Sequence, residues 1–488
     1  MTGLKLFNSL TREIEPFTPV HEGEARVYSC GPTVYNYQHI GNMRAYVFAD
    51  TLGRTLQYKG LRLTHVINIT DVGHLTSDAD EGEDKMEKMA ATQGKSAWDI
   101  AAFYQADFEK DLARLNIQKK QHPKATDYVP EMIEWGKNMA DAHCYELDSG
   151  LYFDISTVAD YGKLARAVTQ EGEGRIDKLE GKRNAGDFAI WRKTPVGETR
   201  QMEWDSPWGK GAPGWHLECS VMGEKLLGFP FDIHTGGIDH REIHHPNEIA
   251  QNQAFSCCGS AGCASEAALD NPTNSGANIW MHNNFLVERS GKMSKSSGEF
   301  LRLQLLVDKG FHPLSYRLMC LQAHYRSELE FSWEGLEAAL TRLKRMVIAA
   351  ERLKDTTSQP IAEHPKFAAS LAKFDEAISD DLGTPVALTA LEEALAVKKV
   401  APQIKRAVIE HMDAVLGLQL FELTRQELRI RPISAEITEA EIEDALARRK
   451  AARAEKDFAA SDAIRDELAA KGVDVMDGDP LGWDWKLP

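Results

Sequence analysis

Residues 25–69 read ARVYSCGPTVYNYQHIGNMRAYVFADTLGRTLQYKGLRLTHVINI, and this stretch sets the predicted fold. Ala25–Cys30 is a short run of β-forming side chains that ends in Cys-Gly-Pro, so it predicts a strand that runs into a turn. Asn42–Gly60 has apolar side chains at helical spacing, and Leu63–Ile69 predicts a second strand. A strand, a helix and a strand in this order begin a parallel, doubly wound Rossmann-like sheet, whose ligands bind at the carboxyl ends of the strands. The loop after the first strand is therefore expected to line the site.

The tetrapeptide His39-Ile-Gly41-Asn42 lies at the amino end of that helix. Glycine lets a nucleotide approach the backbone, and the free N–H groups of a helix start suit phosphate. His39 can donate to charge that develops on a reacting phosphate, and Asn42 can also donate a hydrogen bond. Taken alone, a histidine at a helix start is more often a cap, so this tetrapeptide needs a partner elsewhere in the chain.

A basic loop far downstream offers such a partner. Residues 288–298 read ERSGKMSKSSG, which sets Lys292 and Lys295 among glycines and serines. Lysines on long stems suit a polyphosphate that must be gripped and then released. The alternative for this composition is a solvated basic turn.

The remaining segments outline an α/β protein with a helical second half. Asn68–Asp71 should face the same cleft as the first loop, and the chain between residues 126 and 200 forms an α/β insertion. Lys85–Ala91 and Ala97–Leu115 are predicted helices. The core face predicted for the second of them consists of Trp98, Ile100, Phe103, Phe108 and Leu112.

The sheet is expected to resume near Trp204, with a helix at Gly214–Leu227 and a strand at Phe231–His234. Gly236 and Asp239 follow that strand, and glycine before an acid suits close approach to a ribose, although a structural turn explains it equally well. From Arg302 onward the pattern is helical. A basic cluster near the C-terminus is the best candidate contact with nucleic acid, although such runs are usually solvated faces; it consists of Arg448, Arg449, Lys450, Arg453 and Lys456.

Composition narrows the class of protein. The 488 residues predict several domains, and a formal net charge of −17 does not favour nucleic-acid binding outside a local basic surface. Seven cysteines argue against a disulfide framework. No apolar run approaches a membrane span and the first residues lack a signal-peptide pattern, so we expect a cytoplasmic protein.

These motifs, in this order, resemble the cysteinyl-tRNA synthetase family of class I aminoacyl-tRNA synthetases. The resemblance covers essentially the whole chain, and it depends on CGPTVY at residues 30–35, HIG at 39–41, NITD at 68–71, GWHLEC at 214–219, FDIH at 231–234, HHPNE at 244–248 and KMSKS at 292–296. It implies a Rossmann-like catalytic domain in two halves, residues 1–125 and 201–300. An α/β connective insertion spans 126–200, a helical stem-contact and anticodon-binding bundle 301–430, and a small C-terminal α/β anticodon-region domain 431–488.

The resemblance also implies an activity. L-cysteine and ATP, with Mg²⁺, would give cysteinyl-adenylate, and the 3′ end of cysteine tRNA would then accept the cysteinyl group. His39, Asn42, Lys292 and Lys295 would be catalytic. Thr70 and Trp215 would contact cysteine, and the ATP contacts would be Gly41, His234, Gly236, Asp239 and Lys295. A monomer is expected.

A zinc ion is implied by the same resemblance, with Cys30, Cys219, His244 and Glu248 as ligands. Two thiolates, an imidazole and a carboxylate form a tetrahedral set, and Glu248 would share the helical face of His244. Spacing alone does not establish this set, because isolated cysteines are usually small buried hydrophobic residues and His245 competes with His244. Cys257, Cys258 and Cys263 are interpreted as loop thiols, with a second metal site as the alternative.

The sequence leaves three alternative functions to consider. A ligase that delivers cysteine to an amino sugar would resemble only the catalytic half, so the region from Arg302 to Pro488 counts against it. A noncatalytic tRNA-binding paralogue would not be expected to keep His39, Lys292, Lys295 and the four candidate metal ligands. A zinc hydrolase is not favoured, because the chain lacks an H-E-x-x-H pattern at the histidine pair.

Overall fold

The computed structural model describes residues 2–72, 84–165, 181–256, 271–288, 291–292, 301–357 and 364–488. At its centre is a four-stranded parallel sheet in the order β10-β9-β3-β4. These strands are β3 (Glu24–Ser29), β4 (Arg62–Ile67), β9 (Phe231–Gly237) and β10 (Ala277–Asn283). The predicted parallel sheet is confirmed, and its two halves meet where β3 pairs with β9.

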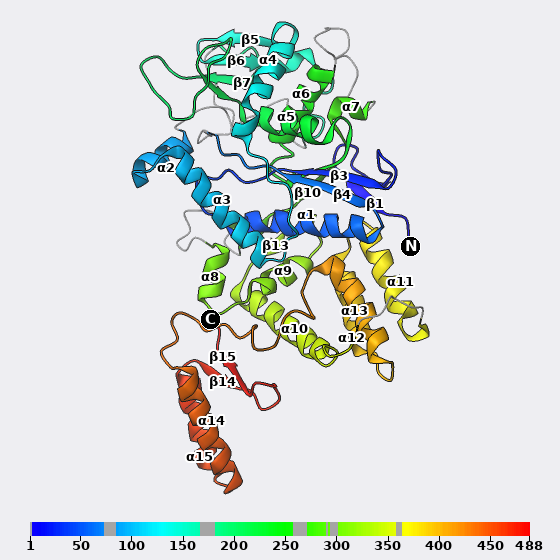
Figure 1. The fold of residues 1–488 in the computed structure, drawn as a ribbon, viewed down its shortest axis with the longest axis vertical. Coiled ribbons are helices and arrows are strands. Elements are labelled where there is room, and N and C mark those ends of the chain that lie inside the picture. The colour runs from blue at the N-terminus through cyan, green and yellow to red at the C-terminus, as the bar shows by residue number, and fades with distance from the viewer. Residues whose placement is uncertain are drawn as a thin grey trace.

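Helices cover both faces of this sheet (Figure 1). Helix α1 (Ile40–Tyr58) lies along one face, and α5 (Trp215–Leu227) and α6 (His244–Ser256) lie over the other. Three helices on two faces give the α/β/α layers of a doubly wound fold. The carboxyl ends of β3 and β9 therefore open between α1 and α5.

The insertion forms a separate antiparallel sheet beyond α5 and α6 (Figure 1). Its elements are α4 (Val129–His143), β5 (Cys144–Leu147), β6 (Gly150–Phe153), β7 (Phe188–Lys193) and β8 (Gly211–Pro213), with short 3₁₀ turns at Ala125–Tyr128 and Ile155–Thr157. The strand order is β5-β6-β7-β8. An α/β insertion at this point of the chain was predicted from the sequence.

Two helices follow β4, namely α2 (Lys85–Gln93) and α3 (Ala97–Arg114). Ile100, Phe108 and Leu112 of α3 are buried, as predicted. The prediction was wrong for Trp98 and Phe103, whose side chains are both 46% exposed. At 100° per residue these two positions fall outside the stripe that faces α1, so their apolar character did not place them in the core.

The helical region packs beneath α1 (Figure 1). It contains α8 (Leu303–Asp308), α9 (Pro313–Leu321), α10 (Trp333–Glu351), α11 (Pro365–Ser379), α12 (Thr384–Ala396) and α13 (Pro402–Leu416). The pattern is not wholly helical, because β13 (Leu329–Glu330) pairs with β11 (Leu286–Glu288), which also pairs with β12 (Gly291–Lys292). This small sheet joins the helical region to the end of the central fold.

A buried carboxylate links α1 to the helical region. Asp50 of α1 is fully buried and accepts from Arg54 at 2.6 Å and from Arg317 of α9 at 2.8 Å. Arg317 also donates to the carbonyl of Leu416 at the end of α13, at 2.7 Å. Because a buried charge is tolerated only when it is paired, these contacts fix α1, α9 and α13 together.

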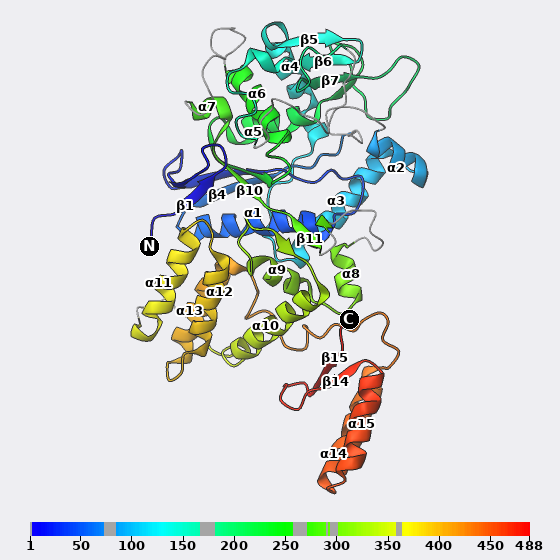
Figure 2. The same ribbon diagram turned by 180° about the vertical axis from the view of Figure 1, so that it is seen from behind.

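The C-terminal unit consists of α14 (Glu439–Ala454), α15 (Phe458–Ala470) and the hairpin of β14 (Val473–Val475) with β15 (Trp483–Trp485). Figure 2 shows the two helices projecting away from the rest of the molecule. The remaining hairpin, β1 (Lys5–Asn8) with β2 (Glu13–Pro16), contacts β10 at the edge of the central sheet.

Acidic side chains pair much of the predicted basic cluster in this unit. Arg449 and Arg453 both contact Asp477, at 2.8 and 3.2 Å, and Arg448 contacts Asp444 at 3.2 Å. The cluster therefore presents less positive charge than its sequence indicates. The last short helix, α7 (Pro272–Ser275), lies between α6 and β10, and no helix among the described residues is both long and apolar enough to cross a membrane.

Candidate functional site

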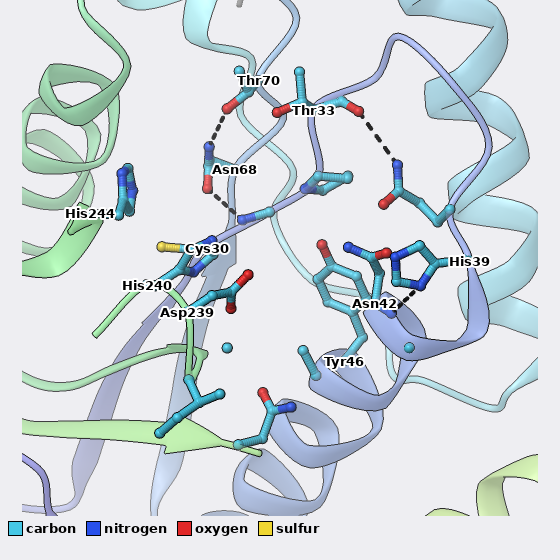
Figure 3. A pocket seen from close by; sticks show the side chains of 18 of the residues that line it. Cys30, Thr33, His39, Asn42, Tyr46, Asn68, Thr70, Asp239, His240 and His244 are labelled. Atoms are coloured by element: carbon cyan, nitrogen blue, oxygen red, sulfur yellow. Dashed lines mark hydrogen bonds between the residues drawn. The ribbon is translucent and has the colours of Figure 1, made fainter. Parts of the chain in front are cut away.

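A cavity of about 370 Å³ opens at the carboxyl ends of β3 and β9 (Figure 3). Its walls come from the loop after β3, the start of α1, the end of β4, the start of α5 and the chain after β9. Figure 3 shows Cys30, Asp239 and His244 on one side of the cavity and His39 and Asn42 on the other. This is the edge at which the sequence predicted a site.

The four predicted metal ligands come together, and three of them, Cys30, Cys219 and His244, line one end of this cavity. One donor atom from each of Cys30, Cys219, His244 and Glu248 lies within 4.8 Å of every other. The His244 Nε2–Glu248 Oε1 distance is 3.0 Å, and the Cys30 Sγ–Glu248 Oε1 distance is 3.9 Å. Zinc bonds of about 2.0–2.3 Å in a tetrahedron fit separations of this size. The chemistry and the geometry of these donors therefore fit a zinc ion.

The electrostatics of these side chains also favour a bound cation. Burial raises the pKa of Glu248, but the neighbouring His234 and His244 outweigh burial and lower it. A hydrogen bond from Cys30 lowers the pKa of Cys219 below its usual value, in spite of burial. A carboxylate and a thiolate thus face each other in a buried space, and together they raise the pKa of His244 to about 10 in spite of burial. A cation that replaced the His244 proton would meet the same two anions.

A second group of donors lies behind the first. Cys30, His234, His245 and Glu248 also place one donor atom each within 4.8 Å of one another. His245 Nδ1 lies 2.7 Å from Nε2 of His282, whereas His244 Nδ1 lies 2.9 Å from Nδ1 of His216. Only His244 of the competing pair lines the cavity. This accessibility favours His244 over His245 as the ligand at the cavity.

The opposite end of the cavity begins α1. His39 Nδ1 accepts the backbone N–H of Asn42 at 3.1 Å, so His39 caps the helix, and both residues line the cavity. The cap and the predicted catalytic position are therefore compatible. A Cβ on Gly41 would lie 2.9 Å from the His39 ring, so glycine leaves room for the ring in this position.

Only some of the described residues predicted to contact ATP line the cavity. Gly41 and Asp239 line the cavity, whereas His234 and Gly236 are not among its lining residues. His234 Nε2 lies 2.9 Å from Oε2 of Glu248. A Cβ on Gly236 would come within 2.7 Å of the rings of His240 and His245. Glycine at this position therefore leaves room for these two histidine rings beside the candidate metal ligands.

The lysine loop is described only at its edges. The backbone of Lys292 forms β12, which pairs with β11, and Leu286 at the start of β11 lines the cavity. Leu301, just beyond the loop, accepts a hydrogen bond from the backbone N–H of Ile40 at 2.8 Å. Both edges of the loop thus lie near the start of α1. Lys295 lies outside the described residues, as do Cys257, Cys258 and Cys263.

Comparisons with known proteins agree with this geometry. Residues 16–341 match the family of tRNA synthetases class I (C) catalytic domain, and residues 438–480 match the cysteinyl-tRNA ligase anticodon binding domain. The chain is 72% identical to a cysteine–tRNA ligase of Novosphingobium aromaticivorans, covering 99% of this chain and 97% of the relative. A cysteine–tRNA ligase of Zymomonas mobilis is 51% identical, covering 98% and 97%.

The chain belongs to the cysteine–tRNA ligase family. It therefore carries a class I aminoacyl-tRNA synthetase domain and an anticodon-binding domain. A Mycobacterium tuberculosis methionyl-tRNA synthetase bound by methionyl-adenylate has a similar fold, with a TM-score of 0.51 at 14% identity, covering 81% of this chain and 90% of that one.

Thr70 and Trp215, the two residues predicted to contact cysteine, both line the cavity. The ring of Trp215 stacks on that of His244, with centroids 4.2 Å apart. Thr70 donates from its hydroxyl to Oε2 of Glu218 at 2.7 Å. Thr70 is therefore held by a buried carboxylate one residue before the candidate ligand Cys219.

Sequence reasoning missed several supporting residues of the ligase site. Glu218 is 1% exposed and holds Thr70, His216 contacts His244, and His282 contacts both His245 and the hydroxyl of Ser9 at 2.8 Å. The sequence could have pointed to Glu218 and His216, because both lie in the GWHLEC motif that also contains Cys219. His282 lies on β10, which the sequence did not predict as a strand.

Proposed function

We propose that this chain is a zinc-dependent cysteine–tRNA ligase that joins L-cysteine to cysteine tRNA through a cysteinyl-adenylate. The observation that carries the proposal is the convergence of Cys30, Cys219, His244 and Glu248 within 4.8 Å at one end of a cavity whose other end is the start of α1. A thiol-binding end and a phosphate-binding end in one cavity suit a reaction between cysteine and ATP.

In this proposal, Cys30, Cys219, His244 and Glu248 hold the zinc ion. When bound there, zinc supplies a soft Lewis acid that prefers a thiolate to a hydroxyl. This preference matters because serine and cysteine have similar sizes, and pocket shape alone separates such pairs by only about 1–3 kcal/mol. Thr70 and Trp215 form the adjoining wall and orient the rest of the amino acid.

At the other end of the cavity, the residues at the start of α1 and in the lysine loop bind the phosphates of ATP and neutralise their charge. The carboxylate of cysteine attacks the α-phosphate of ATP, the new P–O bond forms, and the bond to the β-phosphate breaks to release pyrophosphate. His39, Asn42, Lys292 and Lys295 stabilise the charge that develops. Gly41 and Asp239 contribute to the adenosine side from the cavity wall, and His234 and Gly236 contribute to it from behind that wall, beside Glu248 and His245. No side chain need act as a nucleophile, so catalysis depends on positioning and electrostatics.

The second step consumes the adenylate. A terminal hydroxyl of cysteine tRNA attacks the carbonyl of cysteinyl-adenylate, an ester bond forms, and AMP leaves. Mg²⁺ is expected with ATP, because a divalent cation offsets the charge of the phosphates. We further propose a monomer located in the cytoplasm, with the domain boundaries given in the sequence analysis.

An exchange assay tests the proposed function. The full-length protein should incorporate labelled pyrophosphate into ATP when cysteine is present and far less when serine is present. A zinc chelator should abolish this exchange, and added zinc should restore it. Charging of cysteine tRNA should then follow the exchange activity. Equal exchange with serine, or full exchange with cysteine after verified removal of zinc, would contradict the proposal.

A further inference from the structure

Beside the cavity lies a cluster of aromatic and basic side chains that the proposed reaction has not used. It consists of Tyr37, Phe103, Lys95 and Arg302, and we refer to it as the aromatic rim. Tyr37 lines the cavity from the loop after β3. Phe103 of α3 is 46% exposed and meets Tyr37 edge-on, with ring centroids 6.1 Å apart. The rim is thus continuous with the cavity wall.

Two cations complete the aromatic rim. The Lys95 ammonium group lies 5.2 Å from the centroid of the Phe103 ring, and the Arg302 guanidinium lies 4.4 Å from that of Tyr37. Two acids of α3 lie in the field of these cations: Asp111 interacts with Arg302 and also pairs with Arg114 at 3.6 Å, and Asp99 interacts with Lys95. A local pair of cations is notable in a chain of net charge −17.

The rings of the rim are held in place from below. Tyr104 is buried, meets Tyr37 at right angles with centroids 5.0 Å apart, and accepts a hydrogen bond from Gln93 at 3.1 Å. Phe103 therefore rests on a fixed support while half of its side chain faces water. An exposed ring on a rigid base leaves apolar surface that a planar ligand can cover.

Exposed aromatic rings beside cations are the chemistry that binds unpaired nucleotides. Bases stack on such rings without regard to sequence, and the cations meet the phosphates between them. We propose that the aromatic rim binds the unpaired 3′-terminal nucleotides of the tRNA as they enter the cavity. This inference rests on the proposed function, because only the transfer step brings a 3′-terminal ribose to this cavity.

The position of Tyr37 supports this occupant. Since Tyr37 belongs both to the cavity wall and to the rim, an RNA 3′ end that leaves the cavity past Tyr37 meets the rim. A small nucleotide such as ATP, held within the cavity, would not reach Phe103, which is not among the lining residues. The rim therefore acts in the transfer step and not in adenylate formation.

Phe103→Ala in the full-length protein tests the proposal. The KM for cysteine tRNA in charging should rise about tenfold, which is within the range for the loss of one stacked base. ATP–pyrophosphate exchange involves no tRNA, so its KM for ATP and for cysteine should stay within about twofold of wild type. Phe103→Trp should restore charging, because it restores a stacking surface.

Trp98→Ala is the matched control. Trp98 lies on the same helix and is equally exposed at 46%, but its ring contacts that of Trp204, outside the rim. It should charge tRNA like wild type. A second control uses the tRNA itself: binding of cysteine tRNA without its unpaired 3′ nucleotides should be equal for wild type and Phe103→Ala.

The outcomes separate this inference from the proposed function. If the wild-type protein shows no cysteine-dependent ATP–pyrophosphate exchange, the proposed function is wrong, and the proposal that the rim binds the tRNA 3′ end falls with it. If wild type charges tRNA and Phe103→Ala charges it equally well, the rim proposal alone is overturned. An increase in the KM for ATP, or an equal loss of binding with the shortened tRNA, would also overturn it.

Discussion

Cys30 directly follows β3, Cys219 lies in the second turn of α5, and their sulfur atoms lie within 4.8 Å of each other. A serine at position 219 would preserve the size of the side chain but replace a thiolate donor by a hydroxyl that stays protonated near neutral pH. We expect Cys219→Ser to lower zinc affinity by about tenfold or more. The KM for cysteine in pyrophosphate exchange should rise in parallel, while the KM for ATP changes little. Metal analysis of the purified protein and exchange kinetics measure both effects.

Cys144→Ser provides the control for this prediction. Cys144 is a partly buried free thiol of β5 in the insertion, and it does not line the cavity. Its replacement should leave zinc content and the KM for cysteine unchanged. If both variants lose zinc equally, or if Cys219→Ser keeps its zinc and its KM for cysteine, the ligand assignment is wrong.

The residues that could be named from the sequence are those whose role is fixed by a local motif. His39 is both the cap that its position predicts and a residue of the cavity wall. Glu218 lies in the GWHLEC motif, but its role was not assigned, because that role depends on Thr70, which lies 148 positions away in the chain. His245 could not be separated from His244 without knowing which ring reaches the cavity.

At the scale of elements, the start of α9 offers a test of pH dependence. His312 Nδ1 accepts the backbone N–H of Leu314 at 3.2 Å, so the cap requires an unprotonated ring nitrogen. Burial lowers the pKa of His312 from 6.5 to about 4. The unfolded chain therefore binds this proton more readily than the folded chain. The stability that this residue contributes is complete above pH 6.5 and is lost as the pH falls from 6.5 towards 4.

His312→Asn keeps a side-chain acceptor at the cap but cannot titrate. We expect its free energy of unfolding to depend less steeply on pH between 4 and 6.5, by up to about 1.4 kcal/mol per pH unit. Denaturant unfolding at several pH values, with pH 8 as the baseline for each protein, measures this difference. Parallel curves for the two proteins would show that His312 does not supply the pH dependence.

Most elements were predictable, and the exceptions have physical reasons. The helix predicted at 97–115 is α3, Ala97–Arg114, because its buried stripe keeps a helical period. The exposure of Trp98 and Phe103 could not be predicted, since neither a helical pattern nor an aromatic side chain specifies what covers a helix. β10 was missed because Asn278, His282 and Asn283 interrupt its apolar pattern, and its pairing with β9 depends on residues far away.

At the scale of the whole molecule, α1 connects the reaction site to the helical region. Its first residues line the cavity, and Asp50 in its middle holds Arg54 of the same helix and Arg317 of α9. A Cβ on Gly417, at the end of α13, would lie 2.6 Å from the Arg317 guanidinium, so the three helices meet without spare room. The catalytic and helical parts are therefore expected to move as one body.

The C-terminal unit is joined to this body through fewer groups. Arg425 is 1% exposed and pairs with Asp479 at 2.8 Å and with Asp484, which also pairs with Lys344 of α10. Arg425→Met would leave the Asp479 carboxylate buried without this partner, and such a loss typically costs about 3–5 kcal/mol. We expect local loosening of the unit that carries the anticodon-binding domain, without unfolding of the central sheet.

This loosening predicts a split between the two reaction steps. Arg425→Met should raise the KM for cysteine tRNA in charging while ATP–pyrophosphate exchange stays near wild type, because exchange uses only the cavity above α1. Hydrogen exchange should increase in β14, β15 and the residues around Arg425 and stay constant in α1. Lys373→Gln, which removes an exposed lysine paired with Glu393 at 2.6 Å, should change neither step. If ATP–pyrophosphate exchange falls together with tRNA charging in Arg425→Met, the C-terminal unit supports the catalytic fold itself. The division of the molecule into one central body and a separately held C-terminal unit would then be wrong.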